Sequence, residues 1–550
     1  MLRSGGAAFS ICPWDRVTDH LFLPHVALDM IARTGSRRVL VCILLFLLSC
    51  SGKVTEQGQQ DTLTVGCVIP ERIEELDPLS GPFAYSPLVE LVFNGLVRVD
   101  DRLEVVPDLA ESWEVSEDGL TWTFHLKKGV TFHDGVECTA EDVKFTYDLV
   151  MDPAVDSHLL PALRQFNRVE VVDRYEIAIH LRQPHAPILA SLNAPIVPEH
   201  LLRGTDYPSV DFNLHPVGTG PFRLRSWEPD TQIVFEANEN YFGGKPKLSQ
   251  VAVSVYSDQR ALWVSLMKGN VDLASSLSPE FFEIVAHDRR LATYASTYSS
   301  CYTLQYNLRR PLFSDRRVRQ AIACAVDRNA LIKDALLGQG VVATGPFLPG
   351  TWPCDPTISA IPYDSGKALE LLREAGWNDP DGDGFLGKNG QSLEFTVLID
   401  QGDDMKQKAA GLIRLQLEEI GVRIRVKALP YALMIKRIRA GSFDVSFAQI
   451  NPGLDPDVAS IVWGSKAAYN FGSYENTEAD ALFDRGRVTY SYDKRQEIYH
   501  KIHATLVQDH PAVFLFYPRR YGARTIRLKG APNMSAIQLF SSVEQWRLTK

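Results

Sequence analysis

The chain carries, at residues 107–147, the stretch PDLAESWEVSEDGLTWTFHLKKGVTFHDGVECTAEDVKFTY. Large apolar side chains fall there at close to every second position, at Trp113, Val115, Leu120, Trp122, Phe124 and Leu126. This spacing is typical of two β-strands, and Glu117-Asp118-Gly119 between them predicts the turn of a hairpin. Thr139, followed by two acidic residues and an apolar run, predicts a helix start, because acidic side chains stabilise a helix N-terminus. The stretch therefore predicts a hairpin followed by a helix.

An apolar run, residues 39–48, lies close to the N-terminus, and three arginines precede it: Arg33, Arg37 and Arg38. A basic segment before a short apolar run is typical of a secretory signal, whereas a membrane-spanning helix needs about 20 apolar residues. The residues Leu-Leu-Ser-Cys that end at Cys50 resemble a lipobox, which predicts that Cys50 is lipidated and becomes the mature N-terminus. The alternative is a short buried strand or helix with an incidental cysteine.

Three segments follow from this interpretation. Residues 1–29 have the pattern of neither a signal nor a domain, so we expect a non-native N-terminal extension and a true start at Met30. Residues 30–49 are then a lipoprotein signal peptide, and residues 50–61 are the lipidated cysteine and a flexible polar tether. A single lipid-modified terminus anchors a protein without a transmembrane helix. The sequence thus predicts an extracytoplasmic protein, in the periplasm or on the outer surface of the cytoplasmic membrane.

The charge and the cysteines exclude several classes of function. The formal net charge is −10, and it becomes −12 without residues 1–50, which hold five Arg and three Asp. An acidic chain lacks the basic surface that nucleic acid requires, so we expect no nucleic-acid partner. The cysteines after Cys50 are widely spaced and form no CxxC, which argues against a zinc site and a dense disulfide framework. One disulfide of undefined pairing remains open among Cys67, Cys138, Cys301, Cys324 and Cys354.

Short strands alternate with amphipathic helices along the chain. The clearest unit predicts strands at 393–399, 422–426 and 443–449 and helices at 405–420 and 432–440. This order predicts a parallel or mixed sheet covered by helices, and an α/β fold class. Further strands are expected at 62–69 and 271–274, and further helices at 84–93, 259–268, from a Ser314 cap to Gly338, and at 368–375 after a Ser365 cap.

Four blocks of sequence carry a family resemblance that covers nearly all of residues 62–520. They are residues 107–147; 216–222 followed by Trp227; 240–246; and 302–307 with 313–322 and Asp327-Arg328. In this order they resemble family 5 of the extracytoplasmic solute-binding proteins, which includes the oligopeptide- and dipeptide-binding proteins of ABC transporters. The resemblance implies a two-lobed periplasmic-binding-protein-like clam of type II, cluster C, with an inserted extra domain.

The resemblance also implies domain boundaries. Domain I is expected at 62–97, 215–302 and 510–550, the inserted domain II at 98–214, and domain III, the second lobe, at 303–509. The chain is expected to cross between the lobes near 300–305 and again near 508–515. Two crossings make a hinge, and the cleft between the lobes is the expected ligand site.

Two acidic or histidine motifs have ordinary structural interpretations. His133-Asp134-Gly135 has no second metal ligand at a usable spacing, so we expect a turn. Asp379, Asp381 and Asp383 resemble the start of a calcium loop, but position 12 of such a loop is Gly390, so only weak calcium binding remains open. GxSxG, HExxH and Walker A motifs are absent, and we expect neither an enzyme nor a bound cofactor or metal.

The segment 450–463 follows a predicted strand that ends at the cleft. In peptide binders of the family, an aspartate here pairs with the ligand's α-ammonium, and that position falls on Pro452, with Asn451 beside it. Proline cannot serve, and an ammonium buried without a partner costs several kcal/mol. Either Asp455 or Asp457 takes over this role, or the ligand is not a free-amino peptide.

Six residues are the predicted ligand contacts: Asn451, Asp455, Asp457, Trp463, Tyr302 from the hinge region and Tyr85 from domain I. Two of them have equal structural alternatives, since Asp455 suits a helix N-cap and Trp463 suits the core. The combination of Asn, Asp and Trp equally suits a sugar, whose hydroxyl groups need planar acceptors and whose apolar face needs an aromatic ring.

These expectations combine into one function. The chain is predicted to be a monomeric substrate-binding lipoprotein of an ABC importer, which captures a peptide or similar small solute by hinge closure. Its expected partners are that ligand, a membrane permease and its ATPase, and the membrane through its lipid. Alternatives are an oligosaccharide- or metal-chelate-binding protein on the same scaffold, a surface lipoprotein acting as a chaperone or adhesin, and a periplasmic hydrolase.

Overall fold

The computed structural model describes residues 61–68, 75–80, 87–100, 102–157, 159–205, 207, 210–297, 299–451, 453–531 and 539–550. The predicted extension, signal peptide, Cys50 and tether lie outside the described residues, as does Tyr85. None of the helices in the described ranges combines the length and the apolar character that a membrane crossing demands.

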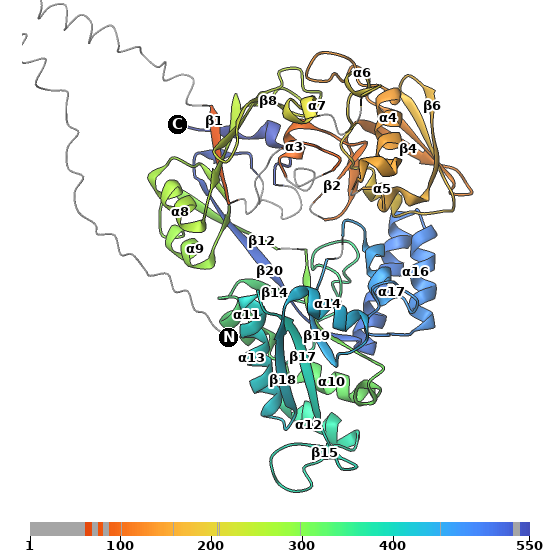
Figure 1. Cartoon of the computed structure of the whole chain (residues 1–550), viewed down its shortest axis with the longest axis vertical. Helices are drawn as coiled ribbons and strands as arrows, with labels where there is room; N and C mark the ends of the chain where they lie inside the picture. The colour runs from red at the N-terminus through yellow and green to blue at the C-terminus, as the bar shows by residue number, and fades with distance from the viewer. Residues whose placement is uncertain are drawn as a thin grey trace, which may run out of the picture. The chain divides into compact units, whose positions relative to one another are not determined.

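A sheet of twelve strands runs through the structure (Figure 1). Its main path has the order β18-β17-β19-β13-β20-β11-β1-β10-β9-β8, and β12 and β14 also pair with β20. Its strands are β1 (Thr62–Val68), β8 (Phe222–Glu228), β9 (Gln232–Ala237), β10 (Gln250–Tyr256), β11 (Leu273–Leu277), β12 (Leu291–Thr297), β13 (Cys301–Tyr306), β14 (Gly340–Val342), β17 (Glu394–Asp400), β18 (Arg423–Leu429), β19 (Val445–Ile450) and β20 (Ala512–Thr525).

The 14-residue strand β20 joins the two halves of this sheet. Its first half pairs with β13 and β14, up to the pair Gly340↔Pro518. From the pair Thr297↔Arg519 onward it pairs with β12 and β11. Because the partners change between Pro518 and Arg519, one continuous strand belongs to both halves. The mixed sheet and the structural neighbours described below confirm the predicted two-lobed α/β clam.

The stretch 107–147 folds as its sequence predicts. Strands β4 (Ala110–Val115) and β5 (Thr121–Leu126) form a hairpin, and Gly119 in its turn has φ +70°. With β6 (Phe166–Asp173) and β7 (Glu176–Leu181) they make a sheet of order β4-β5-β7-β6. Helix α4 (Ala140–Met151) begins after Thr139, whose backbone N–H donates to Asp142 Oδ2 at 2.8 Å. The predicted hairpin and helix start are both confirmed.

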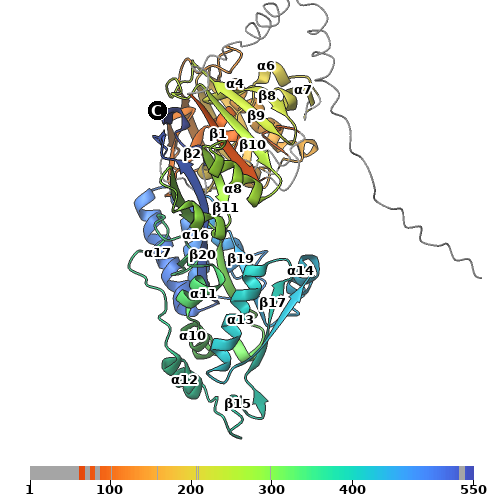
Figure 2. The same cartoon turned by 90° about the vertical axis from the view of Figure 1, so that its left-hand side faces the viewer.

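The predicted β-α-β-α-β unit is also confirmed. Helix α13 (Asp404–Glu418) connects β17 to β18, and α14 (Tyr431–Arg439) connects β18 to β19. Strand β17 is parallel to both β18 and β19, whereas β19 is antiparallel to β13, so the sheet is mixed. Figure 2 shows α13 beside β17.

Three helix predictions need correction. The helix expected from a Ser314 cap begins after Asp315, whose carboxylate accepts the Arg317 N–H, and ends as α10 (Arg316–Cys324). A separate helix, α11 (Arg328–Ala335), follows. Asp327 caps its start by accepting the Ala330 N–H, and the Arg328 guanidinium donates to Ala323 O of α10 at 3.1 Å. Asp364, not Ser365, caps α12 (Ser365–Glu374), and the helix expected at 84–93 is described only as α3 (Val89–Val92). At α10 and α12, an aspartate just before the helix accepts the backbone N–H group that a serine was expected to bind.

The other elements are short or flank the sheets. They are β2 (Val97–Val99), β3 (Val105–Pro107), α5 (Ile188–Ser191), α6 (Glu199–Leu202), α7 (Val210–Leu214), α8 (Gln259–Lys268), α9 (Pro279–Val285), β15 (Gly387–Lys388), β16 (Gln391–Ser392), η6 (Pro456–Ala459), α15 (Ser460–Trp463), α16 (Thr477–Val488), α17 (Tyr492–Asp509), β21 (Leu528–Lys529) and β22 (Arg547–Leu548). Helix α8 has the predicted bounds and ends at Gly269, which has φ +78°.

Several contacts join residues 98–214 to Trp352 and to the region of α16 and α17. Trp352 Nε1 donates to Leu103 O at 3.0 Å, and the Tyr490 hydroxyl donates to Gly119 O at 3.1 Å. Tyr490 also packs edge-on against Trp122, with ring centroids 5.4 Å apart. The hairpin turn of the 107–147 stretch is therefore a contact surface as well as a local fold signal.

Candidate functional site

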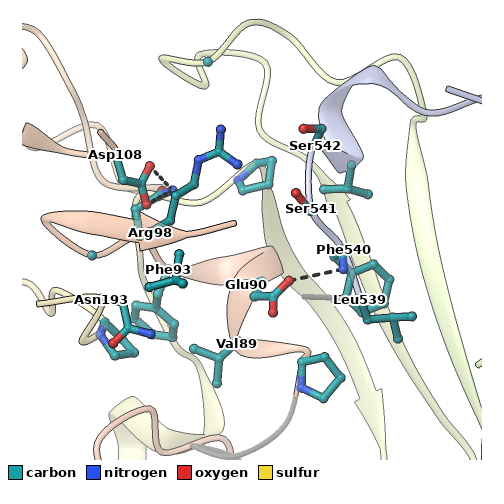
Figure 3. A pocket seen from close by; sticks show the side chains of 18 of the residues that line it. Val89, Glu90, Phe93, Arg98, Asp108, Asn193, Leu539, Phe540, Ser541 and Ser542 are labelled. Carbon is teal, nitrogen blue, oxygen red and sulfur yellow. Dashed lines mark hydrogen bonds between the residues drawn. The ribbon is translucent and has the colours of Figure 1, made fainter. Parts of the chain in front are cut away.

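A cavity of about 690 Å³ lies among segments that are far apart in the sequence (Figure 3). One wall comes from α3, β2 and the residues that follow β3, and another from the C-terminal segment 539–544. Ser275 of β11, Tyr294 and Ser296 of β12 and Arg520 of β20 line it next to the point where β20 changes partners. Leu454, from the loop after β19, lines it too. Residues from one half of the large sheet and from the loop that follows β19 of the other half therefore meet at this cavity.

Strand β2 places a cation on the cavity wall. Val97 and Val99 are fully buried, whereas Arg98 between them is half-buried and lines the cavity. This alternation follows from strand geometry, in which successive side chains point to opposite faces. In Figure 3 the Arg98 guanidinium extends away from Asp108 into the space before Ser541 and Ser542.

Asp108 stands next to Arg98 in a buried polar cluster. Asn94 Nδ2 donates to both carboxylate oxygens of Asp108, at 3.0 and 3.1 Å, and Asn94 Oδ1 accepts the Thr219 hydroxyl at 3.1 Å. Burial raises the pKa of Asp108 to about 6, although the Asn94 hydrogen bonds and the nearby Arg98 and Lys127 charges oppose this rise. A carboxyl group with this pKa is partly protonated in weakly acidic solution.

Tyr294 lines the cavity, and its neighbour across the sheet is glycine. Tyr294 of β12 lies directly opposite Gly522 of β20, and its hydroxyl donates to Ala274 O at 3.1 Å. A Cβ at position 522 would come within 2.1 Å of the Tyr294 ring and hydroxyl. Only glycine therefore leaves room for this ring across β20.

Two predicted ligand contacts, Asp455 and Asp457, are held by arginines of the helices that follow. Asp455 accepts two hydrogen bonds from Arg495 of α17, at 2.6 and 2.7 Å, and caps η6 by accepting the Asp457 N–H. Asp457 accepts hydrogen bonds from Arg487 at 3.1 and 3.3 Å and from the Tyr499 hydroxyl at 3.3 Å. The N-cap alternative for Asp455 is confirmed, and both carboxylates serve the protein's own packing.

The remaining predicted contacts have different surroundings. Asn451 is exposed, and its Oδ1 accepts the Gly453 N–H at 3.0 Å. Trp463 is 1% exposed and packs edge-on against Phe514, so the core alternative is confirmed for it. Tyr302 is buried, stacks on a phenylalanine of β20 and donates its hydroxyl to the side chain of Gln449.

The cavity and the predicted contacts do not coincide. Of the described cavity-lining residues, Leu454 comes from the predicted segment 450–463, while Asn451, Asp455, Asp457 and Trp463 do not line the cavity. Sequence reasoning missed Arg98, Asp108, Lys127, Arg520 and the segment 539–544. The one available signal was an arginine between two valines in a short strand. The ligand role of the predicted residues stays a prediction.

The two motifs that resemble metal sites are explained by local contacts. His133 Nε2 donates to Gly220 O at 3.0 Å, and its Nδ1 accepts the Gly218 N–H at 3.3 Å, so the predicted structural turn is confirmed. Asp379, Asp381 and Asp383 are exposed, with their oxygens within 4.8 Å of one another. The Asp379 carboxylate, however, accepts the N–H groups of Gly382 and Gly384, as in an ordinary turn. Weak calcium binding there stays a prediction.

The cysteines of the described residues are free thiols. Cys138, Cys301, Cys324 and Cys354 are buried, and Cys67 is half-buried with its sulfur 3.4 Å from the Ser275 hydroxyl. Burial raises the pKa of each of these thiols, which keeps them protonated and unreactive. None of the pairings left open by the sequence is formed among them.

Comparisons with known proteins identify this architecture. The chain is 29% identical over 542 residues to the oligopeptide-binding protein AppA of Bacillus subtilis, covering 93% of this chain and 98% of that protein. It is 28% identical over 511 residues to di/tripeptide-binding protein 2 of Pseudomonas aeruginosa, covering 86% and 93%.

Solved structures agree with these relatives. The structure of AppA from Bacillus subtilis in complex with a nonapeptide matches with a TM-score of 0.66 and 28% identity over 89% of this chain and 100% of that one. That of NikZ from Campylobacter jejuni in complex with Ni(L-His) matches with a TM-score of 0.69 and 27% identity, over 89% and 99%. The unliganded open form of the murein tripeptide-binding protein MppA, at 20% identity, supports the fold alone, with a TM-score of 0.78 over 90% and 98%.

A family model covers most of the chain. The model for bacterial extracellular solute-binding proteins, family 5 Middle, matches residues 104–471. It includes the 107–147 hairpin and helix start as well as the β-α-β-α-β unit. The chain therefore belongs to the bacterial extracellular solute-binding proteins of family 5.

Proposed function

We propose that this protein captures a peptide in the cavity beside β20 and delivers it to the permease of an ABC importer. Members of the family are binding proteins, and the single observation that carries the proposal is the cavity of about 690 Å³. This volume lies within the range of about 300–1,000 Å³ that is typical of small-ligand sites. Its lining combines residues from both sides of the β20 crossing, such as Tyr294 and Leu454.

Capture proceeds through hinge closure. The hinge consists of the connection between β12 and β13 and of β20 near Pro518, where the ladder partners change. Domains I, II and III then have the boundaries expected from the sequence. A ligand that touches Leu454 on one side and Tyr294 on the other gains both contacts only in the closed form, so it shifts the population towards that form. The permease recognises the closed form, and its ATPase supplies the energy.

A peptide is the first candidate ligand because two relatives bind oligopeptides or di- and tripeptides by name. A metal chelate is the second, since NikZ holds Ni(L-His). These molecules share a carboxylate next to polar and apolar groups, and the cavity offers cations, hydroxyl groups and aromatic rings together. A sugar, which the sequence left open, finds no comparable support among these relatives.

Ligand identity is tested by denaturing protein purified from its native host and analysing the released small molecules by mass spectrometry. Binding is then measured by intrinsic tryptophan fluorescence against peptide, oligosaccharide and metal-chelate panels. Saturable binding of peptides with one site supports the proposal. Turnover of a panel member would contradict it in favour of a hydrolase, and binding of denatured proteins alone would favour a chaperone.

Membrane attachment is a separate part of the proposal, because Cys50 lies outside the described residues. We propose that Cys50 is lipidated and that residues 50–61 tether the folded body to the membrane. The wild-type protein is expected in the membrane fraction and to incorporate labelled palmitate. A Cys50→Ala variant is expected to lose both properties, and a membrane-bound variant without label would contradict lipid anchoring.

A further inference from the structure

The Arg98 guanidinium faces the cavity without a partner from the described part of the chain. It forms no hydrogen bond or ion pair with any described residue, although it lines the cavity and is half-buried. Strand β2 places the Arg98 side chain on the face opposite those of the fully buried Val97 and Val99, although atoms of both valines also line the cavity. A cation that is partly removed from water gains from an acceptor that replaces the lost hydration.

Asp108, the acidic residue next to Arg98, does not supply such an acceptor. Both carboxylate oxygens of Asp108 accept hydrogen bonds from Asn94, and burial raises the pKa of Asp108 to about 6. The carboxylate is therefore committed to Asn94, and near pH 6 it carries only part of a negative charge. Arg98 is close enough to oppose this rise electrostatically but is not hydrogen-bonded to Asp108.

A second cation increases the positive charge of this wall. Lys127 also lines the cavity, donates a hydrogen bond to Asp108 O, and lies 4.9 Å from the centroid of the Phe242 ring. Burial lowers the pKa of Lys127, and the Arg98 charge lowers it further. The cavity lining holds three cations, Arg98, Lys127 and Arg520, and three acidic residues, Glu90, Glu544 and Asp108. Because Asp108 is partly neutralised, the wall around Arg98 and Lys127 favours an incoming anion.

The planar shape of the Arg98 guanidinium favours one kind of anion. A guanidinium is planar and presents paired N–H donors that match the two oxygens of a carboxylate. The segment across from it carries the hydroxyl groups of Ser541 and Ser542, which line the same cavity and donate readily to an anion. We propose that Arg98 binds a carboxylate of the ligand, which in a peptide is its C-terminal carboxylate. This inference rests on the proposed function.

The test removes the charge on either side of the contact. Tripeptide and nonapeptide libraries are synthesised once as free acids and once as C-terminal amides, and the dissociation constants of the most strongly retained peptides are measured by calorimetry. Wild-type protein is expected to bind the acids about 10- to 100-fold more tightly than the amides, the range for a hydrogen bond to a charged group. Arg98→Gln is expected to weaken acid binding by that factor and to leave amide binding unchanged.

Two further variants control the comparison. Arg98→Lys keeps the charge but loses the paired donors, so its preference for acids is expected to fall between those of wild type and Arg98→Gln. Arg164 is exposed and does not line the cavity, so Arg164→Gln is expected to keep the wild-type preference. Circular dichroism verifies that each variant is folded.

The outcomes separate the inference from the proposed function. If acids and amides bind wild-type protein equally, or if Arg98→Gln keeps the preference for acids, the Arg98 inference is wrong while peptide binding stands. If neither library binds the wild-type protein, the proposal of peptide capture fails and the inference fails with it.

Discussion

Replacing Asp455 with alanine removes one half of a buried, bidentate ion pair. The side chains of Asp455 and Arg495 are 12% and 10% exposed, and two hydrogen bonds of 2.6 and 2.7 Å join them. Arg495 also donates to Gly486 O and lies 5.4 Å from the Trp352 ring. Its guanidinium therefore cannot move into solvent without breaking these contacts. Asp455→Ala therefore leaves a buried cation.

The expected loss follows from this geometry. Breaking a buried pair by removing one partner costs about 3–5 kcal/mol of unfolding free energy. Asp455→Asn keeps an oxygen for the N-cap but loses the charge, so about 2–3 kcal/mol is expected from the weakened hydrogen bonds to Arg495. Asp484 provides the matched control, because it pairs with Arg487 while 76% exposed. A surface pair of this kind contributes about 0–1 kcal/mol, so Asp484→Ala is expected to change little.

Urea denaturation of ligand-free protein, followed by far-UV circular dichroism, measures these differences. Peptide binding is measured in parallel by tryptophan fluorescence. A structural Asp455 predicts a large loss of stability. If Asp455→Ala unfolds within about 0.5 kcal/mol of wild type, the range of an ordinary surface substitution, yet no longer binds peptide, the reasoning is refuted. Asp455 would then be the ligand contact that the sequence predicted.

Three further predictions use the same denaturation assay. Gly119→Ala places a methyl group 2.1 Å from the Tyr490 hydroxyl, whereas Gly135→Ala meets nothing within 4 Å at a similar positive φ. Each variant is expected to lose about 1–2 kcal/mol of unfolding free energy because alanine is strained in the left-handed region. Gly119→Ala is expected to lose more than Gly135→Ala because of its clash with Tyr490. Equal losses would show that Tyr490 moves aside freely. Burial lowers the pKa of His133 to about 4, so the unfolded chain, with a pKa near 6.5, binds more protons between these values. Wild type is therefore expected to lose up to about 3 kcal/mol as pH falls from 6.5 to 4, and His133→Gln is expected to flatten that slope; an unchanged slope would contradict the assignment. Trp463→Ala empties a core position and is expected to cost about 3–5 kcal/mol, and a stable variant with impaired binding would instead place Trp463 at the ligand.

The local elements could be read from the sequence where a short-range signal specifies them. The hairpin at 110–126 is specified by alternating apolar residues and a glycine with φ +70°. Helix α8 has its predicted bounds because Asp258 caps its start and Gly269 ends it. Errors occurred where two caps competed within one or two residues, as at Ser314 and Asp315. The family and the two-lobed α/β class followed from the order of such local blocks.

The tertiary structure alone decided which residues form the site. The cavity joins Arg98, Tyr294, Leu454, Arg520 and the segment 539–544, and no local pattern connects positions so far apart. The tertiary structure also determines the partners of the acidic residues after β19, because Asp455 and Asp457 bind arginines 40 and 30 residues further along the chain. The sequence does not distinguish an aspartate whose carboxylate binds a ligand from one whose carboxylate pairs with a buried arginine. Sequence by itself determined the scaffold, because strands and helices depend on neighbouring residues, while the binding surface depends on long-range packing that brings distant side chains together.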